Sequence, residues 1–256
     1  MFEKDMMDIA IKAAKAGGKI LMSHYKKEHH VHSKGPLEIF TEVDVLSETE
    51  IKKIIKKAFP KHGILGEEEG KTEGDSDYVW IIDPLDGTNN YQNQIDFFNV
   101  SIAVAKGNEL IIGVVYDPVR DELFAAEKDK GATLNGKEIK VRQRTALNHC
   151  MLATNPASTL NKFKSVQYRR FWHKLRAPRI IGAKALELAY VACGRLDIYY
   201  NTSTFLWDVA AGILIIREAG GVVKKFDGSE WMIDDNEFIA TERTLLPQIL
   251  KIISRY

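Results

Sequence analysis

The chain has 256 residues, 45% of them hydrophobic and 28% charged, a composition typical of a folded globular protein and not of a disordered one. Lysine and arginine total 36 against 35 acidic residues, so the net charge gives no reason to expect binding to nucleic acid or to a membrane surface. No apolar stretch is long enough to span a membrane and the N-terminus lacks the features of a signal peptide, so we expect a cytoplasmic protein.

The N-terminal part is predicted to contain two amphipathic helices. Apolar residues recur at helical spacing from Met6 to Leu21, and again from about Glu42 to Phe59. In the second helix the lysines are expected to face solvent, and the residues expected to face inward are Leu46, Ile51, Ile54, Ile55 and Ala58. The segment between the helices, His29 to Leu37, lacks periodicity and is predicted to be an exposed loop, whose histidines we interpret as surface residues.

Between Tyr78 and Lys137 the pattern changes to short apolar runs rich in Val, Ile and Phe. The strands predicted from these runs are 79–82, 97–105, 110–116 and 123–126, with turns at 106–108 and 117–121. Because the connections between these strands are short, the pattern favours a mostly antiparallel sheet.

After about residue 142 strands and helices alternate. The predicted strands lie near 151 and at 179–181, 196–200, 222–223 and 238–240, and the predicted helices at about 160–175, 184–193, 206–219 and 245–253. The sequence therefore predicts an α/β (α+β layered) protein, with a mostly antiparallel N-terminal half, residues 1–142, joined to an α/β half, residues 143–256. Cys150 and Cys193 lie in apolar surroundings and are expected to be buried free thiols.

The most informative segment runs from Trp80 to Asn90 and reads Trp-Ile-Ile-Asp-Pro-Leu-Asp-Gly-Thr-Asn-Asn. An apolar strand leads into Asp83, and a proline then turns the chain so that Asp83 and Asp86 can converge, which a straight strand would not allow. Two carboxylates held close together repel unless a cation neutralises them, and all-oxygen ligands suit Mg²⁺. At Gly87 and Thr88 backbone N–H groups are able to approach a bound phosphate. We interpret the segment as a combined metal and phosphate site.

A second acidic segment precedes this one. Glu67 follows the apolar strand end Ile64-Leu65-Gly66, and it is the best placed of three consecutive glutamates to complete a cation site. Glu68 and Glu69 are consistent with a solvated run.

Two more aspartates have alternative roles. Asp44 has the spacing of a capping box with Thr41 at the start of the second helix, and the functional alternative is that Asp44 orients Thr88. Asp208 lies at the start of the apolar helix after Trp207, where the helix dipole favours a carboxylate whether or not it also faces a cation.

Together these segments resemble the inositol monophosphatase family of lithium-sensitive, magnesium-dependent phosphatases. The matching runs, in family order, are Thr41-Glu42-Val43-Asp44, Gly66-Glu67-Glu68, Trp80 to Asn89, and Leu206 to Gly212. Gly131 to Lys140 and Glu218 to Gly221 are also similar, so the likeness covers nearly the whole chain. The run Asp-Pro-Leu-Asp-Gly-Thr joined to a distant Trp-Asp is highly specific.

The resemblance implies an alternating αβαβα sandwich, commonly dimeric, that acts on a small phosphorylated substrate with about two or three Mg²⁺ ions per active site. The metal ligands it implies are Glu67, Asp83, Asp86, Asp208 and the backbone carbonyl of Leu85. Glu67 and Thr88, the latter supported by Asp44, would activate the attacking water. The substrate contacts it implies are Gly87, Thr88, Ala183, Lys184, Asn201 and Asp208, and Lys34 would lie in a mobile loop that closes on the site.

The chain departs from the family pattern in the substrate pocket. Asn201 stands where inositol-specific members usually carry a hydroxyl-binding glutamate, and Lys184 replaces a small residue in the stretch that lines the sugar pocket. Lys184 is either a surface residue or a contact for a second phosphate.

Three functional hypotheses follow. The leading one is a magnesium-dependent phosphatase for inositol monophosphate or a related polyol or sugar phosphate. The alternative is a bisphosphate-preferring relative that acts on fructose 1,6-bisphosphate, NADP or a 3′-phosphonucleotide, which Lys184 and Asn201 favour. The third is a protein that binds a macromolecular partner and has secondary phosphatase activity.

Overall fold

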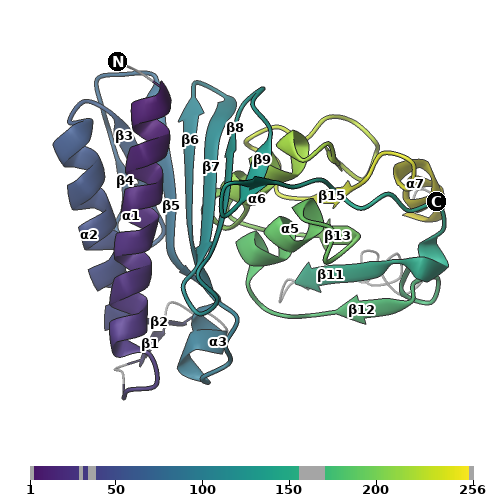
Figure 1. Ribbon diagram of the computed structural model, residues 1–256, viewed down its shortest axis with the longest axis horizontal. Helices are drawn as coiled ribbons and strands as arrows, with labels where there is room; N and C mark the ends of the chain where they lie inside the picture. The colour runs from purple at the N-terminus through teal and green to yellow at the C-terminus, as the bar shows by residue number, and fades with distance from the viewer. Residues whose placement is uncertain (1–2, 29–30, 34–38, 156–170, 254–256) are drawn as a thin grey trace.

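Helices and sheets alternate in layers in the computed structural model, which describes residues 3–28, 31–33, 39–155 and 171–253 (Figure 1). α1 (Glu3–His24) and α2 (Glu42–Ala58) cover one face of a large sheet. α5 (Lys184–Ala192) and α6 (Leu206–Glu218) lie between this sheet and a smaller one, and α7 (Leu246–Ile253) covers the far side of the smaller sheet. This order of layers confirms the predicted αβαβα sandwich.

The large sheet has eight strands in the order β10-β9-β8-β7-β6-β5-β3-β4. Their bounds are β3 (Gly63–Gly66), β4 (Gly70–Thr72), β5 (Tyr78–Asp86), β6 (Asn99–Lys106), β7 (Glu109–Asp117), β8 (Glu122–Glu127), β9 (Ala132–Leu134) and β10 (Lys137–Glu138). Neighbouring strands are antiparallel except for β3 and β5, which run parallel. The mostly antiparallel sheet and the two predicted turns, between β6 and β7 and between β7 and β8, are therefore confirmed.

The smaller sheet has five strands in the order β12-β11-β13-β15-β14. Their bounds are β11 (Met151–Asn155), β12 (Ala177–Arg179), β13 (Ile198–Asn201), β14 (Val222–Lys224) and β15 (Phe238–Thr241). β11 runs parallel to both of its neighbours, whereas β15 runs antiparallel to β13 and β14. Among the short elements, β1 (Val31–Ser33) pairs with β2 (Ile39–Thr41), α3 (Thr88–Gln92) follows β5, and a 3-10 turn (Leu147–His149) precedes β11.

Each space between layers is filled by an apolar core. One core joins α1 and α2 to the large sheet, the next surrounds α5 and α6 between the sheets, and the third lies under α7. Because β5, β6 and β7 are covered on both faces, nearly every position along them is buried, and their sequences are apolar runs instead of alternating patterns.

The inward face of α2 differs from the predicted one. Leu46 is 46% exposed and Ala58 also faces solvent. The first turns of the helix bury polar residues instead: Asp44, Ser47 and Glu48. The prediction was wrong at this point because it looked only for apolar residues at helical spacing, whereas this face of α2 contacts polar chain segments.

Some expectations concern segments outside the description. Lys34 lies outside the described residues, as does most of the helix expected at about 160–175. Both cysteines are free, with Cys150 buried and Cys193 half-buried. The division at residue 142 falls between β10 and β11, but α6 packs on the large sheet, so a division into two halves stays a prediction.

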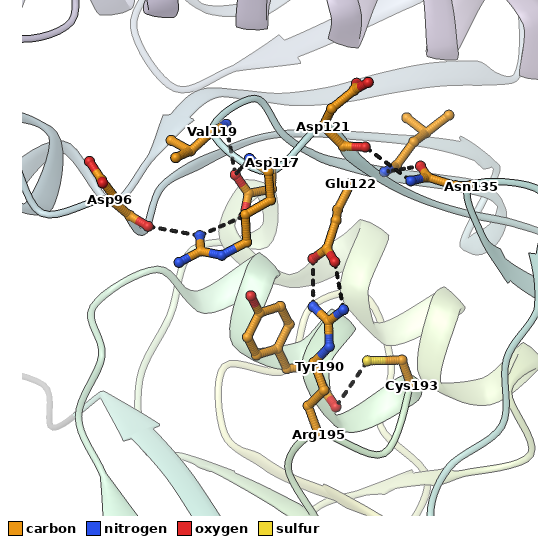
Figure 2. Close-up of polar contacts among 11 residues, drawn as sticks. Asp96, Asp117, Val119, Asp121, Glu122, Asn135, Tyr190, Cys193 and Arg195 are labelled. Atoms are coloured by element: carbon orange, nitrogen blue, oxygen red, sulfur yellow. Dashed lines mark hydrogen bonds and ion pairs between the residues drawn. The ribbon is translucent and has the colours of Figure 1, made fainter.

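An ion pair ties the end of α5 to the large sheet. Arg195 donates through both of its terminal nitrogens to the Glu122 carboxylate at the start of β8 (Figure 2). The Arg195 guanidinium also lies 4.7 Å from the centre of the Tyr190 ring, which belongs to α5. This contact helps to fix α5, whose N-terminus carries predicted site residues, against the sheet.

Candidate active site

Asp83 and Asp86 lie on the same face of β5 because the strand bulges between them. Asp83 pairs with Ser101 and Asp86 with Asn99, so three steps along β5 match two steps along β6. Residues three apart in a regular strand point to opposite faces, and one extra residue reverses this. Pro84 lies in the bulge, where the ladder does not need its missing N–H. Both carboxylates are buried.

One face of α2 holds the bulge and the segments on either side of it. Asp44, Ser47 and Glu48 are buried, and their spacing of three and four residues places them on one side of the helix. The Ser47 hydroxyl donates to the Pro84 carbonyl at 3.1 Å. The helix therefore fixes the bulge directly, while its other two polar residues contact the neighbouring segments.

Glu48 fixes the turn that carries Glu67. The Glu48 carboxylate accepts the N–H of Glu68 at 2.8 Å and the N–H of Glu69 at 3.0 Å. Lys52 Nζ lies 2.5 Å from the same carboxylate and balances its buried charge. The two glutamates that the sequence analysis interpreted as a solvated run thus have a structural role through their backbone.

Gly66 allows this turn to approach the helix. A Cβ at Gly66 would come within 2.3 Å of Glu48 Oε1, so a larger residue would displace the carboxylate. The next N–H, that of Glu67, donates to the Ile82 carbonyl at 3.2 Å. Glu67 is therefore held between α2 and the strand that carries Asp83.

Thr88 connects Asp44 to the chain that follows the bulge. Thr88 Oγ1 lies 3.1 Å from Asp44 Oδ1 and 3.0 Å from the Leu85 carbonyl oxygen, and its single proton goes to one of them at a time. Asp44 Oδ2 accepts both the N–H and the hydroxyl of Thr41, at 2.8 and 2.6 Å. The two alternatives for Asp44, a capping box and the orientation of Thr88, are both present, one on each oxygen.

The N-terminus of α5 holds the Asp86 carboxylate. The N–H groups of Lys184 and Ala185 donate to it at 2.9 and 2.7 Å, and Asn99 Nδ2 donates at 2.7 Å. A helix N-terminus favours negative charge, so this arrangement stabilises the ionised form of Asp86.

Asp208 lies in the first turn of α6 and faces α5. Its Oδ2 accepts Lys184 Nζ at 2.5 Å, Thr204 Oγ1 at 2.8 Å and the Phe205 N–H at 3.1 Å. The bond from Phe205 caps the helix, and the bond from Lys184 crosses to the other helix of the site. Asp208 is thus brought near Asp86 from a segment distant in the sequence.

Burial and neighbouring acids raise the pKa values of Asp83 and Asp86. The pKa of Asp83 lies well above its usual value, first because burial disfavours the charged form, and then because Glu67, Asp86 and Asp208 place negative charge nearby. Burial and the Asp208 charge raise the pKa of Asp86 to about 6, against hydrogen bonds that lower it. The Asp83 and Glu67 carboxyl groups are within hydrogen-bonding reach of one another. Such a cluster favours a cation.

The donor atoms suit a hard divalent cation, because all of them are oxygens. The ligands that the family resemblance predicts are the carboxylates of Glu67, Asp83, Asp86 and Asp208 and the Leu85 carbonyl. Within the described residues, no three acidic, histidine or cysteine side chains already have the geometry of a formed metal site. Hydrogen bonds from the N-terminus of α5 and from Lys184 engage oxygens of Asp86 and Asp208. The chemical type of these donor atoms therefore suits a divalent ion. The Lys184 ammonium contacts one of the acids, Asp208.

Three of the predicted substrate contacts, Gly87, Ala183 and Asn201, lie in two places. Gly87 and Ala183 lie against each other, since a Cβ at Gly87 would be 3.1 Å from Ala183 Cβ, and the Gly87 φ of 94° is one that glycine adopts most easily. Asn201 is fully buried at the end of β13, where its Nδ2 donates to the Asn236 carbonyl at 2.9 Å. Asn201 Oδ1 has no hydrogen-bond partner among the described residues.

Sequence analysis missed several residues that hold the site in place. Besides Ser47, Glu48 and Asn99, they include Glu187, which accepts the N–H groups of Ile181 and Gly182 at 2.9 and 3.1 Å. Burial raises the pKa of Glu187 to about 8. The helical spacing from Asp44 was a usable signal for the two α2 residues, whereas neither Asn99 nor Glu187 follows from any local pattern.

Comparison with known proteins matches residues 3–256 to the model of the inositol monophosphatase family. The chain is 40% identical to Nus factor SuhB of Haemophilus influenzae, over 96% of this chain and 95% of that protein. It is 38% identical to inositol monophosphatase 2 of Solanum lycopersicum, over 94% and 95% of the two chains. Among solved structures, the extragenic suppressor protein suhB of Bartonella henselae superposes with a TM-score of 0.94 at 34% identity, covering 98% and 99% of the two chains. In the described part of the chain, no helix has the length and apolar character needed to cross a membrane.

Proposed function

Because the chain belongs to the inositol monophosphatase family, we propose that it hydrolyses a small phosphate monoester, inositol monophosphate or a related polyol or sugar phosphate, in a Mg²⁺-dependent reaction. The observation that supports this most directly is the bulge in β5, which turns Asp83 and Asp86 to one face. Glu67 and Asp208 are close enough to Asp83 for the charge of each to raise the pKa of its carboxyl group. This is the acidic cluster on which the family resemblance rests.

The resemblance also implies finer properties that we include in the proposal. They are about two or three Mg²⁺ ions per active site, inhibition by lithium, a homodimer and a cytoplasmic location. The ions would be held by Glu67, Asp83, Asp86, Asp208 and the Leu85 carbonyl.

A bound divalent cation supplies positive charge that favours deprotonation of the attacking water and stabilises the charge that develops on the phosphoryl group. Thr88 and Asp44 would accept the proton that the attacking water loses. When the Leu85 carbonyl is engaged elsewhere, Thr88 Oγ1 donates to Asp44 Oδ1 and its lone pairs accept a hydrogen bond from the water. Burial raises the pKa of Asp44, which makes this carboxylate a stronger acceptor for the proton.

The remaining residues would bind and orient the ester. The N–H groups of Gly87 and Thr88 are proposed to hold phosphate oxygens, and Glu67 is proposed to help activate the attacking water. Ala183 and Asn201 are proposed to contact the polyol. No covalent intermediate with the enzyme is required, because the nucleophile is water.

The test is a phosphate-release screen across polyol, sugar and nucleotide esters, with and without Mg²⁺. We expect Mg²⁺-dependent release from at least one monoester at turnover typical of enzymes, on the order of 1 per second or more. Purified, folded protein that releases no phosphate from any ester with Mg²⁺ present would refute the proposal.

Binding of a macromolecular partner is the competing role, and it is favoured by the similarity to a protein named as a Nus factor, SuhB of Haemophilus influenzae. Affinity capture with the tagged chain separates the two roles. A stoichiometric partner together with negligible turnover would favour the binding role over the enzyme.

A further inference from the structure

Lys184 brings a positive charge into the acidic cluster. Its Nζ lies 2.5 Å from Asp208 Oδ2, and the two side chains are only 25% and 12% exposed. Lys184 is also the first residue of α5, and its N–H donates to Asp86 Oδ1 at 2.9 Å. A single residue thus contacts two of the proposed metal ligands, one through its side chain and one through its backbone.

The Asp208 oxygen that Lys184 contacts is saturated. Oδ2 also accepts Thr204 Oγ1 at 2.8 Å and the Phe205 N–H at 3.1 Å. A carboxylate oxygen offers two lone pairs, so three donors leave none for a metal ion. A Mg²⁺ ion that bound this oxygen would have to approach it to about 2.0–2.1 Å, which requires a donor such as Lys184 to move away.

Asp86 is engaged in a similar way. Its Oδ2 accepts the Ala185 N–H and Asn99 Nδ2, both at 2.7 Å, and its Oδ1 accepts the Lys184 N–H. Two of these donors belong to the backbone of α5, and Asn99 is fully buried on β6, so none of them is easily displaced. About one lone pair, on Oδ1, is left for a cation.

The positive charge of Lys184 acts more weakly on Asp83 than on Asp208, which its ammonium contacts directly. The charges that act most strongly on Asp83 are those of Glu67, Asp86 and Asp208, all of them acidic. The cluster is therefore asymmetric, with a protein ammonium at Asp208 and mutually repelling carboxylates around Asp83. An added cation is therefore attracted more strongly to the carboxylates around Asp83 than to Asp208.

We propose that Lys184 Nζ is a built-in cation of this active site, and that at Asp208 it takes the place of one of the divalent ions, about two or three per active site, that the family resemblance implies. The inference rests on the proposed phosphatase function, because it concerns an ion that this function uses. It also addresses the two alternatives left by the sequence. The side chain is too buried for a surface residue, and its charge is already paired with Asp208, not held ready for a second phosphate.

The test counts bound ions. Mn²⁺, which takes the same oxygen ligands as Mg²⁺, is titrated into wild type and Lys184→Met, and free Mn²⁺ is followed by electron paramagnetic resonance. We expect Lys184→Met to bind one additional ion, or to bind its weakest ion at least about tenfold more tightly, because the competing charge is gone. Lys128→Met is the matched control, since it removes a lysine from an exposed ion pair with Glu109. It should bind Mn²⁺ like the wild type.

Equal ion numbers and affinities in wild type and Lys184→Met would overturn the proposal. So would a crystal of the wild type grown with Mn²⁺ in which an ion contacts Asp208 Oδ2 and Lys184 is displaced. An unchanged ion count together with a higher KM for bisphosphates alone would establish the second-phosphate role instead. Lys184→Gln provides a second neutral variant if the first does not fold. Because ion counting needs no turnover, failure of the phosphatase assay and failure of this inference are distinguishable.

Discussion

Replacing Glu48 with glutamine tests whether the turn that carries Glu67 depends on α2. Glu48 is fully buried, and its carboxylate accepts two backbone N–H groups, at 2.8 and 3.0 Å, and pairs with Lys52 at 2.5 Å. Glutamine fills the same space, but its amide nitrogen would meet one of the N–H donors. The substitution thus removes a charge-assisted hydrogen bond and the buried half of an ion pair without creating a cavity.

The expected loss of stability is the sum of two effects. Losing one hydrogen bond to a buried charged group costs about 1.5–3 kcal/mol. Leaving a buried charge without any partner would cost about 3–5 kcal/mol. Lys52 still pairs with Glu69 at 3.0 Å, so the loss of its ion pair with Glu48 costs less than this. We expect Glu48→Gln to lower the free energy of unfolding by about 2–4 kcal/mol. Displacement of Glu67 should also lower kcat by about 10–100-fold, a typical effect of losing a group that positions a metal ligand.

Urea denaturation and Mg²⁺-dependent phosphate release measure the two effects. Glu69→Gln is the control, because it removes only a half-exposed ion pair with Lys52 and keeps the backbone N–H, so it should cost less than about 1 kcal/mol and leave kcat unchanged. If Glu48→Gln changes stability by less than about 0.5 kcal/mol and has normal turnover, the positioning role assigned to this helix face is wrong.

Three further predictions concern the chemistry and its pH dependence. Asp86→Asn should remain folded by circular dichroism and lose nearly all activity, and near-normal turnover would contradict its role as a ligand. Thr88→Val should lower kcat by about 10²–10⁴-fold, whereas Thr88→Ser should retain most of it, because only the hydroxyl can pass a proton toward Asp44. The pKa of Glu187 is raised from 4.5 to about 8 by burial, so the folded state favours its protonated form. Protonated Glu187 therefore adds to the free energy of unfolding. This stabilisation is complete below pH 4.5 and is lost as the pH rises toward about 8, at up to about 1.4 kcal/mol per pH unit. Thermal unfolding between pH 5 and 9 should show a flatter profile for Glu187→Gln than for wild type, and parallel profiles would refute the assignment.

Strands and layers were predictable from the sequence because their signals are local. Apolar runs separated by turn residues gave the strands of the large sheet, and the alternation after residue 142 gave the second layer of strands and helices. The bulge in β5 was also foreseeable, since a proline between two aspartates cannot continue a regular ladder. The inward face of α2 was not, because its buried positions near the site are polar and an apolar periodicity does not include them.

The contact between Lys184 and Asp208 depends on tertiary structure alone. Each residue lies in the first turn of its own helix, and the two are 24 positions apart with β13 between them. No local helix or strand pattern predicts that these two helix ends meet. Sequence analysis therefore identified Lys184 as a departure from the family pattern but offered only a surface role or a second phosphate. The packing of α5 beside α6 places its ammonium on an acid that was expected to face a metal ion.

A helix cap and a site ligand are not exclusive roles for one carboxylate. Asp44 Oδ2 caps α2 through Thr41, three residues away, while Oδ1 receives the hydroxyl of Thr88, 44 residues away. Asp208 caps α6 through Phe205, three residues away, and pairs with Lys184 from another helix. Local patterns detect only the near partner, so they favour the capping role wherever both exist. Since a carboxylate has about four lone pairs, a capping signal at a helix that opens toward an acidic strand end is not evidence against a functional role. The cap fixes the orientation of the side chain, and this fixed orientation is what a binding or proton-transfer group requires.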